Sequence, residues 1–272
     1  MRFFTDAFTE ERANVIAFGV PLGEYGKKSL ESLRKASRFV ESFDVDSKRN
    51  LLENVRIFDA GDVQFLEVTE KVKEIRNSKK IPLMLSNGHL PTLHSLRGFD
   101  HVKLIVFDAH TDLYDKYTDE KMQVTSGNSD EVFSEATWLR RFCEENKKSN
   151  VMLIGIRSAN EDQLSYLSDF KYFTSNFVKG NMETVRKEIE KFTKDSGVYI
   201  SVDIDAFDPS IAPAVEHPEP DGIYFNHFRE LINSVKGKII GLDVCCLKPI
   251  ENNEVTEFLA VKVIFEILGL IK

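Results

Sequence analysis

The chain has few cysteines and no long hydrophobic run, which argues against a disulfide-rich secreted protein and against a membrane-spanning protein. Its 272 residues include three cysteines, Cys143, Cys245 and Cys246. This small, odd number does not make a disulfide framework, and adjacent cysteines rarely bridge because the ring strains the backbone. No segment approaches the roughly 20 apolar residues that cross a bilayer, and the start of the chain lacks the apolar core of a secretory signal. We therefore predict a protein of the reducing cytoplasm, with no membrane partner.

Positive charge is also in short supply. Lysine and arginine number 36 against 44 acidic residues, so the formal net charge is -8 and the pI is about 5.4. Nucleic acids and anionic lipids bind to clusters of basic side chains, so this balance argues against both as main partners. Hydrophobic residues make up 42% of the chain, which is more than a disordered protein contains.

No linker rich in Pro, Gly or Ser and no internal repeat interrupts the chain. We therefore predict a single domain over residues 1–272, long enough to bury a sizeable core. The polar stretch at 115–130 predicts a long loop, and long loops in compact domains are often functional. The stretch at 258–271 carries Lys262 and Glu266 among apolar residues, which predicts an amphipathic core helix.

Short apolar runs alternate with helical patterns along the chain. Several runs lack polar alternation, as expected of strands buried on both faces. The predicted strands are 15–20, 55–58, 82–85, 103–107, 151–156, 172–174, 198–204 and 239–244. The predicted helices are 29–41, 65–76, 137–146, 181–194, 226–236 and 254–268. This order predicts an α/β fold with a mainly parallel sheet covered by helices, and periodicity alone leaves open a doubly wound sheet or a closed barrel.

The strongest chemical signal follows the predicted strand at 103–107. Asp108, His110 and Asp112 come directly after it, and alternate residues of an extended chain point the same way. Three potential ligands are therefore expected on one side at the carboxyl end of the strand. By itself this spacing is equally compatible with a polar loop.

A second signal ends the predicted strand at 198–204. Asp203 and Asp205 are again alternate residues, and carboxylates there are costly unless a cation or hydrogen bonds compensate them. The alternative is that one of them caps a helix or forms a turn. Asp208 fits that alternative well, because it precedes Pro209 and Asp-Pro favours turn initiation.

A third signal is His89, just after the predicted strand at 82–85. A lone histidine there is usually structural. Three separate strands, however, would deliver two histidines and four aspartates to one edge of the sheet. Mixed imidazole and carboxylate ligands suit Mn²⁺, Zn²⁺, Fe or Co, and without a cation these carboxylates would repel one another.

At these residues the chain resembles the ureohydrolase family, which includes arginase, agmatinase, formimidoylglutamase and guanidinobutyrase. That family carries G-G-D-H-S, then D-A-H-x-D, then S-x-D-x-D-x-x-D-P. Residues 108–112 and 201–209 match the second and third motifs in full, and residues 86–90 keep only the histidine of the first. Weaker similarities, at 19–21 and at 58–63, extend the resemblance over nearly the whole chain.

The resemblance implies a fold, a cofactor and a mechanism. The fold would be a three-layer α/β/α sandwich around an eight-stranded, mainly parallel sheet, assembled into a homo-oligomer, a trimer or hexamer. Two divalent ions, most often Mn²⁺ in the family, would hold a bridging hydroxide that attacks the carbon of a linear amidine or guanidine substrate. Asp112 would hold this hydroxide and pass its proton to the departing amine. Agmatine-like substrates are the first expectation.

The resemblance also implies a role for each metal ligand. His89 and Asp112 would bind one ion. His110 and Asp205 would bind the other. Asp108 and Asp203 would bridge the two.

The chain departs from the family pattern where the family reads its substrate. Glu135 stands at the position of a proton-shuttling histidine, and it could shuttle protons, bind a cationic group or be an ordinary surface residue. Glu216 and His217 replace small residues of the P-G-T-G-T-P loop, and His217 could stand in for the missing shuttle or merely face solvent. Cys246 replaces the glutamate that pairs with a guanidinium, which a neutral thiol cannot do.

Two rival interpretations follow from these departures. The chain could keep the metal site for structure or binding without ureohydrolase turnover. It could also be another hydrolase on the same scaffold, such as an amide deacetylase. Glu135 or Glu216 could replace the lost contact from another direction, whereas Cys246 could be a small hydrophobic residue or, less often for a buried cysteine, a nucleophile.

Overall fold

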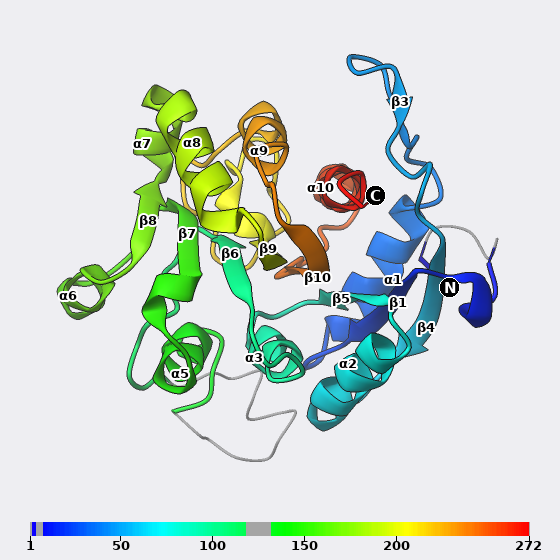
Figure 1. Cartoon of the computed structure of the whole chain (residues 1–272), viewed down its shortest axis with the longest axis horizontal. Coiled ribbons are helices and arrows are strands. Elements are labelled where there is room, and N and C mark those ends of the chain that lie inside the picture. Colours follow the sequence, from blue (N-terminus) through cyan, green and yellow to red (C-terminus); the bar gives the residue numbers. More distant parts are fainter. Residues whose placement is uncertain (1, 4–7, 118–131, 272) are drawn as a thin grey trace.

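The structure is a computed structural model, and it describes residues 2, 3, 8–117 and 132–271 of the chain. Eight strands form one parallel sheet (Figure 1). In chain order they are β1 Val15–Val20, β4 Ile57–Asp62, β5 Ile81–Ser86, β6 Lys103–Phe107, β7 Val151–Ile156, β8 Lys171–Thr174, β9 Gly197–Asp203 and β10 Lys238–Cys245. Across the sheet the order is β4, β1, β5, β10, β9, β6, β7 and β8.

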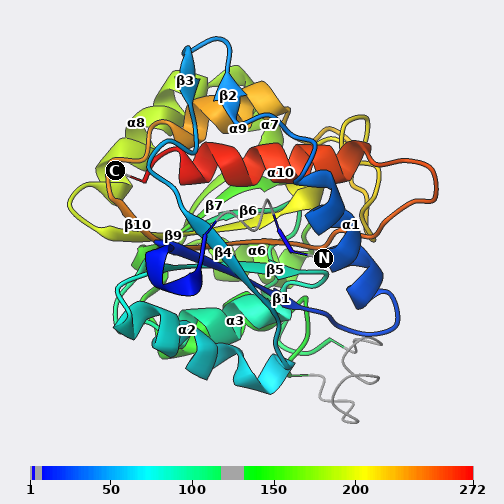
Figure 2. The same ribbon diagram turned by 90° about the vertical axis from the view of Figure 1, so that its right-hand side faces the viewer.

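Helices cover both faces of this sheet, and Figure 2 shows the layers edge-on. One layer contains α1 Gly26–Ala36, α7 Ser175–Gly180, α8 Met182–Thr193, α9 Phe225–Ile232 and α10 Val255–Leu268. The other contains α2 Val68–Asn77, α3 Leu90–Leu96 and α5 Trp138–Glu145, and α6 Glu161–Leu167 adds Leu167 to the same core. Each layer closes an apolar core against its own face of the sheet, which confirms the three-layer α/β/α prediction and excludes a closed barrel.

Three predicted strands, at 15–20, 103–107 and 151–156, agree with the structure to the residue. The strand predicted at 55–58 lies instead at Ile57–Asp62. The search for apolar runs missed this strand because it contains aspartates. The structure accommodates them in ion pairs: Arg34 Nε lies 2.8 Å from Asp59 Oδ2, and Arg34 Nη1 lies 2.6 Å from Asp62 Oδ1.

Several short elements were not predicted. They are α3, α6, α7, the hairpin of β2 Phe43–Asp44 and β3 Arg49–Asn50, and the 3-10 turns η1 Glu10–Arg12, η3 Lys148–Asn150 and η4 Ile204–Ala206, whereas η2 Phe65–Glu67 is the first turn of the helix predicted at 65–76. None is long enough for hydrophobic periodicity to be readable. Of the loop predicted at 115–130, residues 118–130 lie outside the described residues.

The prediction that the last helix, α10, is amphipathic was wrong. It lies in the middle of its layer, between α1 and α9, and most of its 14 residues are buried (Figure 2). A helix surrounded on most sides becomes apolar around most of its circumference. Within the described ranges, no helix combines the length and apolar character needed to cross a bilayer.

The four central strands, β5, β10, β9 and β6, lie side by side and end at the same edge of the sheet. The predicted metal ligands lie at or just after the ends of three of them, and the fourth, β10, ends in Cys245. In open parallel sheets, ligands bind beyond the carboxyl ends of the strands. The fold therefore places the candidate site at the centre of this edge.

Candidate metal centre

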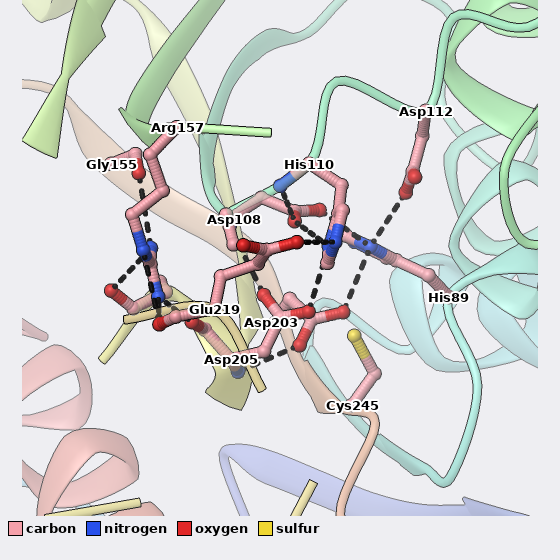
Figure 3. Close-up of polar contacts among 12 residues, drawn as sticks. His89, Asp108, His110, Asp112, Gly155, Arg157, Asp203, Asp205, Glu219 and Cys245 are labelled. Atoms are coloured by element: carbon pink, nitrogen blue, oxygen red, sulfur yellow. Dashed lines mark hydrogen bonds and ion pairs between the residues drawn. The ribbon is translucent and has the colours of Figure 1, made fainter. Parts of the chain in front are cut away.

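The six predicted ligands, two histidines and four aspartates, meet at one place (Figure 3). His89 Nδ1 lies 3.1 Å from Asp108 Oδ2, 3.1 Å from Asp112 Oδ2 and 3.5 Å from Asp203 Oδ2. His89 itself is 1% exposed, so this half of the site is enclosed in protein. We call it the inner half.

The second histidine faces its own carboxylates on the more open side. His110 Nδ1 lies 2.9 Å from Asp205 Oδ2 and 3.7 Å from Asp108 Oδ1. The His110 side chain is 27% exposed, and we call its surroundings the outer half. Asp108 presents one oxygen to each histidine, which is the geometry expected of a bridging ligand.

The residues present fit a metal centre. His89 Nδ1 is buried and has no hydrogen-bond partner of acceptable geometry, although three carboxylate oxygens surround it. A buried polar atom in that position is expected to have a partner. Two ligand sets, His89 with Asp108 and Asp112, and His110 with Asp108 and Asp205, each keep one donor atom per residue within 4.8 Å of the others. Both sets combine imidazole nitrogen with carboxylate oxygen, which suits divalent transition ions.

Electrostatics also favour a cation here. Burial opposes the charged form of His110, but hydrogen bonds to Asp108 and Asp205 raise its pKa to about 12. Burial, together with the charge of Asp108, raises the pKa of Asp112 to about 6. Burial and the charge of Asp205 raise the pKa of Asp203 well above its usual range. Protons thus offset the crowded negative charge, and bound cations would displace them.

The local backbone differs from the extended chain that the sequence suggested. Asp112 has a φ of 52°, a left-handed conformation, so alternation along a strand does not explain where its side chain lies. Asp205 lies in the 3-10 turn η4, and its backbone N–H donates to Asp203 Oδ1 at 2.8 Å. Asp203 is therefore both a cap and a member of the cluster, so the two interpretations of this motif hold together.

A hydroxyl network behind His89 was not predicted. His89 Nε2 lies 2.9 Å from Ser201 Oγ, which donates to Asp243 Oδ1 at 2.7 Å. Tyr199 and Thr92 donate hydroxyls to the other oxygen of Asp243, at 2.7 and 3.1 Å. This buried network holds the ring so that Nδ1 faces the carboxylates. Ser201 belongs to the quoted S-x-D-x-D motif, and that was the available signal.

Two further supporting residues were also missed. Trp138 Nε1 donates to Asp112 Oδ2 at 2.6 Å. Arg157 donates to the backbone carbonyls of Asp205 at 2.7 Å and Glu219 at 2.7 Å, which ties η4 to the loop that follows it. Asp208 forms a turn, as its alternative interpretation predicted, because its Oδ1 accepts hydrogen bonds from the backbone and hydroxyl of Ser210.

Of the four residues that depart from the family pattern, Glu135 and Cys246 lie against the inner half. A Cβ placed on Gly88, next to His89, would collide with the carboxylate of Glu135. The charge of Glu135 also contributes to raising the pKa of Cys246, after burial and the neighbouring thiol of Cys245.

The other two lie toward the surface. His217 is exposed, with its ring centroid 6.3 Å from that of His110. Glu216 accepts a hydrogen bond from the Tyr25 hydroxyl at 2.5 Å and lies 3.7 Å from Lys248 Nζ, so its carboxylate already has partners within the chain.

Comparison with known proteins agrees with this geometry. The sequence profile described as the arginase family matches residues 26–269, which is most of the chain. The chain belongs to the arginase family. The resemblance read from the motifs is thereby confirmed.

Three relatives illustrate where the chain sits among arginase-family proteins. It is 30% identical over 254 residues to an uncharacterized 32.2 kDa protein of Methanothermus fervidus, covering 88% of this chain and 84% of that one. It is 26% identical over 250 residues to an agmatinase of Pyrococcus horikoshii, covering 88% and 83%. The solved agmatine ureohydrolase of Thermoplasma volcanium superimposes with a TM-score of 0.85 at 27% identity, covering 99% of this chain and 94% of that one.

Proposed function

We propose that this arginase-family chain hydrolyses a C–N bond in a linear amidine or guanidine compound, with agmatine-like substrates as the first choice. The observation that carries the proposal is the meeting of two imidazoles and four carboxylates at the carboxyl ends of β5, β6 and β9. The relatives named agmatinase and agmatine ureohydrolase support the substrate class.

The proposed cofactor is a pair of divalent ions. His89 and Asp112 would hold one, His110 and Asp205 the other, and Asp108 and Asp203 would lie between them. Such a pair, when bound, lowers the pKa of water enough to supply a nucleophile near neutral pH. Mn²⁺ is the family expectation for both positions.

The chain's own residues would move the protons and orient the substrate. Asp112 Oδ2 is held by the Trp138 indole at 2.6 Å, so it is fixed where it can hold a proton and deliver it to the leaving amine. The exposed imidazole of His217, beside His110, would exchange that proton with solvent. The proton would thus pass from Asp112 in the inner half to His217 at the surface.

Substrate recognition would fall to a carboxylate other than the family's. Cys246 cannot make a bidentate contact with a planar guanidinium, which needs two acceptor oxygens. The carboxylate of Glu135 has two oxygens and lies against Gly88, next to His89. Glu216 would play a smaller part in binding, because it lies toward the surface, where Tyr25 and Lys248 contact it, and not against the inner half.

The direct test is a substrate panel with Mn²⁺-loaded protein. It contains agmatine, arginine, guanidinobutyrate, formimidoylglutamate, free guanidine and acetylated polyamines. Urea or ammonia from a guanidine or amidine compound supports the proposal, whereas acetate alone points to an amide deacetylase. Glu135→Gln should raise KM for a cationic substrate more than it lowers kcat, and Glu216→Gln is the matched control with the smaller expected effect.

Metal binding without turnover is the second candidate, and Cys246 at the glutamate position is the observation that favours it. No turnover of any compound in the panel, together with two tightly bound ions per chain, would support this candidate. The double variant Cys246→Glu with Glu135→His restores both family residues. Agmatine hydrolysis that occurs only in this variant would show that the natural chain is not an agmatinase.

We also propose that the chain forms a homo-oligomer. Phe39, Val255 and Phe258 are exposed and line one apolar pocket over the α10 layer. Light scattering of the purified protein tests this, with a trimer or hexamer as the expected result and a monomer at micromolar concentration as the contrary one.

A further inference from the structure

Two thiols lie against the inner half of the centre. Cys245 is the last residue of β10, and in the sheet it pairs with Asp203, the last residue of β9. Cys245, Cys246, His89 and Asp203 each offer one ligand atom, and these four atoms lie within 4.8 Å of one another. Figure 3 shows the Cys245 sulfur directed into the space beside Asp203 and His89. Two sulfurs, one nitrogen and one oxygen therefore share a single small volume.

The backbone at Cys246 brings the second sulfur to this volume. Successive residues of an extended strand point to opposite faces, so two adjacent cysteines would normally diverge. Cys246 has a φ of 66°, a left-handed conformation that residues with a side chain rarely adopt. The strand thus turns directly after Cys245, and the two thiols converge. Unusual backbone conformations of this kind are concentrated at functional sites.

The third cysteine shows what a purely structural thiol looks like in this chain. Cys143 is buried within the apolar cluster of α2, α3 and α5, as expected of a cysteine that acts as a small hydrophobic residue. Cys245 is equally buried but lies beside an imidazole and a carboxylate. Packing alone accounts for Cys143 and does not account for the polar surroundings of Cys245.

We propose that Cys245 and Cys246 supply sulfur ligands to the ion held by His89, so that the inner half binds a thiophilic ion of the Zn²⁺ or Co²⁺ class. The inference rests on the proposed metal centre and deepens it. Thiolate sulfur together with imidazole nitrogen suits Zn²⁺ or Co²⁺, whereas Mn²⁺ prefers oxygen ligands. Each thiol that ligates releases its proton to solvent. The outer half, which has no sulfur among its described ligands, keeps the family preference, so the pair would be mixed.

Cobalt spectroscopy tests this without any assay of activity. The full chain is reduced, freed of reductant and titrated with Co²⁺. Visible d–d bands report Co²⁺ bound by any ligands, and a near-ultraviolet sulfur-to-cobalt band reports thiolate ligation. We expect the near-ultraviolet band to saturate at one equivalent. Cys245→Ser and Cys246→Ser should each weaken it, and Cys143→Ser is the matched control that should leave it intact.

A competition assay with a chelator gives a second readout. Loss of one sulfur ligand should weaken Zn²⁺ binding by more than the roughly 10–100-fold that follows loss of a residue hydrogen-bonded to a metal ligand. Mn²⁺ binding to the outer half should change much less. Circular dichroism and thermal unfolding identify any variant that fails to fold, and the wild-type spectrum decides the question in that case.

The outcomes separate this inference from the proposed function. Visible bands that saturate at two equivalents, with no sulfur-to-cobalt band, would support the metal centre and contradict the proposal that the cysteines are ligands. A band that persists in both serine variants but disappears with Cys143→Ser would also overturn them. If the chain binds no Co²⁺, Zn²⁺ or Mn²⁺ at all, both the proposed metal centre and the proposed sulfur ligands are wrong.

Discussion

The inner and outer halves of the centre differ in how they are built. The His89 side chain is 1% exposed and is anchored through Ser201 to a buried carboxylate, Asp243. The His110 side chain is 27% exposed, and its Nε2 lies 3.7 Å from the carboxylate of Glu219 on a surface loop. The inner half is thus part of the core of the fold, whereas the outer half reaches the surface.

This difference follows from the sheet. The inner ligands lie at the ends of β5, β6 and β9, and each of these strands is paired on both sides. The outer ligand Asp205 lies in η4 and depends on loop contacts made by Arg157. A buried, hydrogen-bonded ligand is expected to be rigid, and a loop-supported ligand is expected to open locally at lower cost.

The largest effect should come from the residue that the two halves share. Asp108→Asn removes a carboxylate that faces both histidines, so we expect both ions to be lost. Activity should fall by more than about 100-fold, the most that loss of a residue hydrogen-bonded to a metal ligand typically costs. Elemental analysis and product release measure this. Asp208→Asn, in the neighbouring turn, is the control and should keep its metal. An Asp108→Asn protein with two ions and normal turnover would contradict the proposed bridge.

The next test separates the halves. His110→Asn should lower the metal content from two ions to one, with a smaller loss of thermal stability than His89→Asn, because the His110 side chain is 27% exposed. His89→Asn should lose the inner ion and also leave Ser201 and Asp243 with one partner fewer, at a cost of about 1–3 kcal/mol for the buried network. Equal loss of stability in the two variants would show that the halves are not built differently.

Competition between protons and metal ions for His110 should have an effect of intermediate size on metal affinity. In the metal-free protein the pKa of His110 is raised to about 12, above its ordinary value of 6.5, so the proton is held across the neutral range and stabilises the metal-free fold until the pH passes the folded value. An ion must displace that proton. Metal affinity should therefore rise by about tenfold per pH unit for each proton displaced, between about pH 7 and about pH 9.

Titration calorimetry with Mn²⁺ in buffers of different ionisation enthalpy counts the protons released. His110→Asn serves as the comparison variant, and its affinity should depend less steeply on pH than that of the wild type. Affinity that does not change with pH in the wild type would show that the histidine is already neutral before the ion binds.

The smallest effect should come from the loop that supports the outer half. Arg157→Lys loses the planar fork that reaches the carbonyls of Asp205 and Glu219. We expect a loss of about 1–2 kcal/mol in the free energy of unfolding and weaker binding of the outer ion only. Denaturant titration and metal content report the two effects. Loss of the inner ion as well would mean that the halves are more tightly coupled than the structure indicates.

Much of the fold could be predicted from hydrophobic runs. Strands such as 103–107 are buried on both faces and are therefore continuously apolar, which makes their ends readable. β4 was misplaced because Arg34, distant in sequence, neutralises its carboxylates. The helix at 254–268 was found, but its all-round burial depends on neighbours that a local pattern does not show.

Some features of the candidate site could likewise be predicted from the sequence, and others could not. The sequence by itself predicted which side chains would bind a cation, because aspartate and histidine directly after buried strands need compensation wherever the strands lie. Only the tertiary structure decided how these side chains divide into two halves, that Asp112 and Cys246 use left-handed backbone, and that Cys245 faces His89. Strand order and backbone turns bring distant residues together, and neither is encoded in the spacing of residues along one segment.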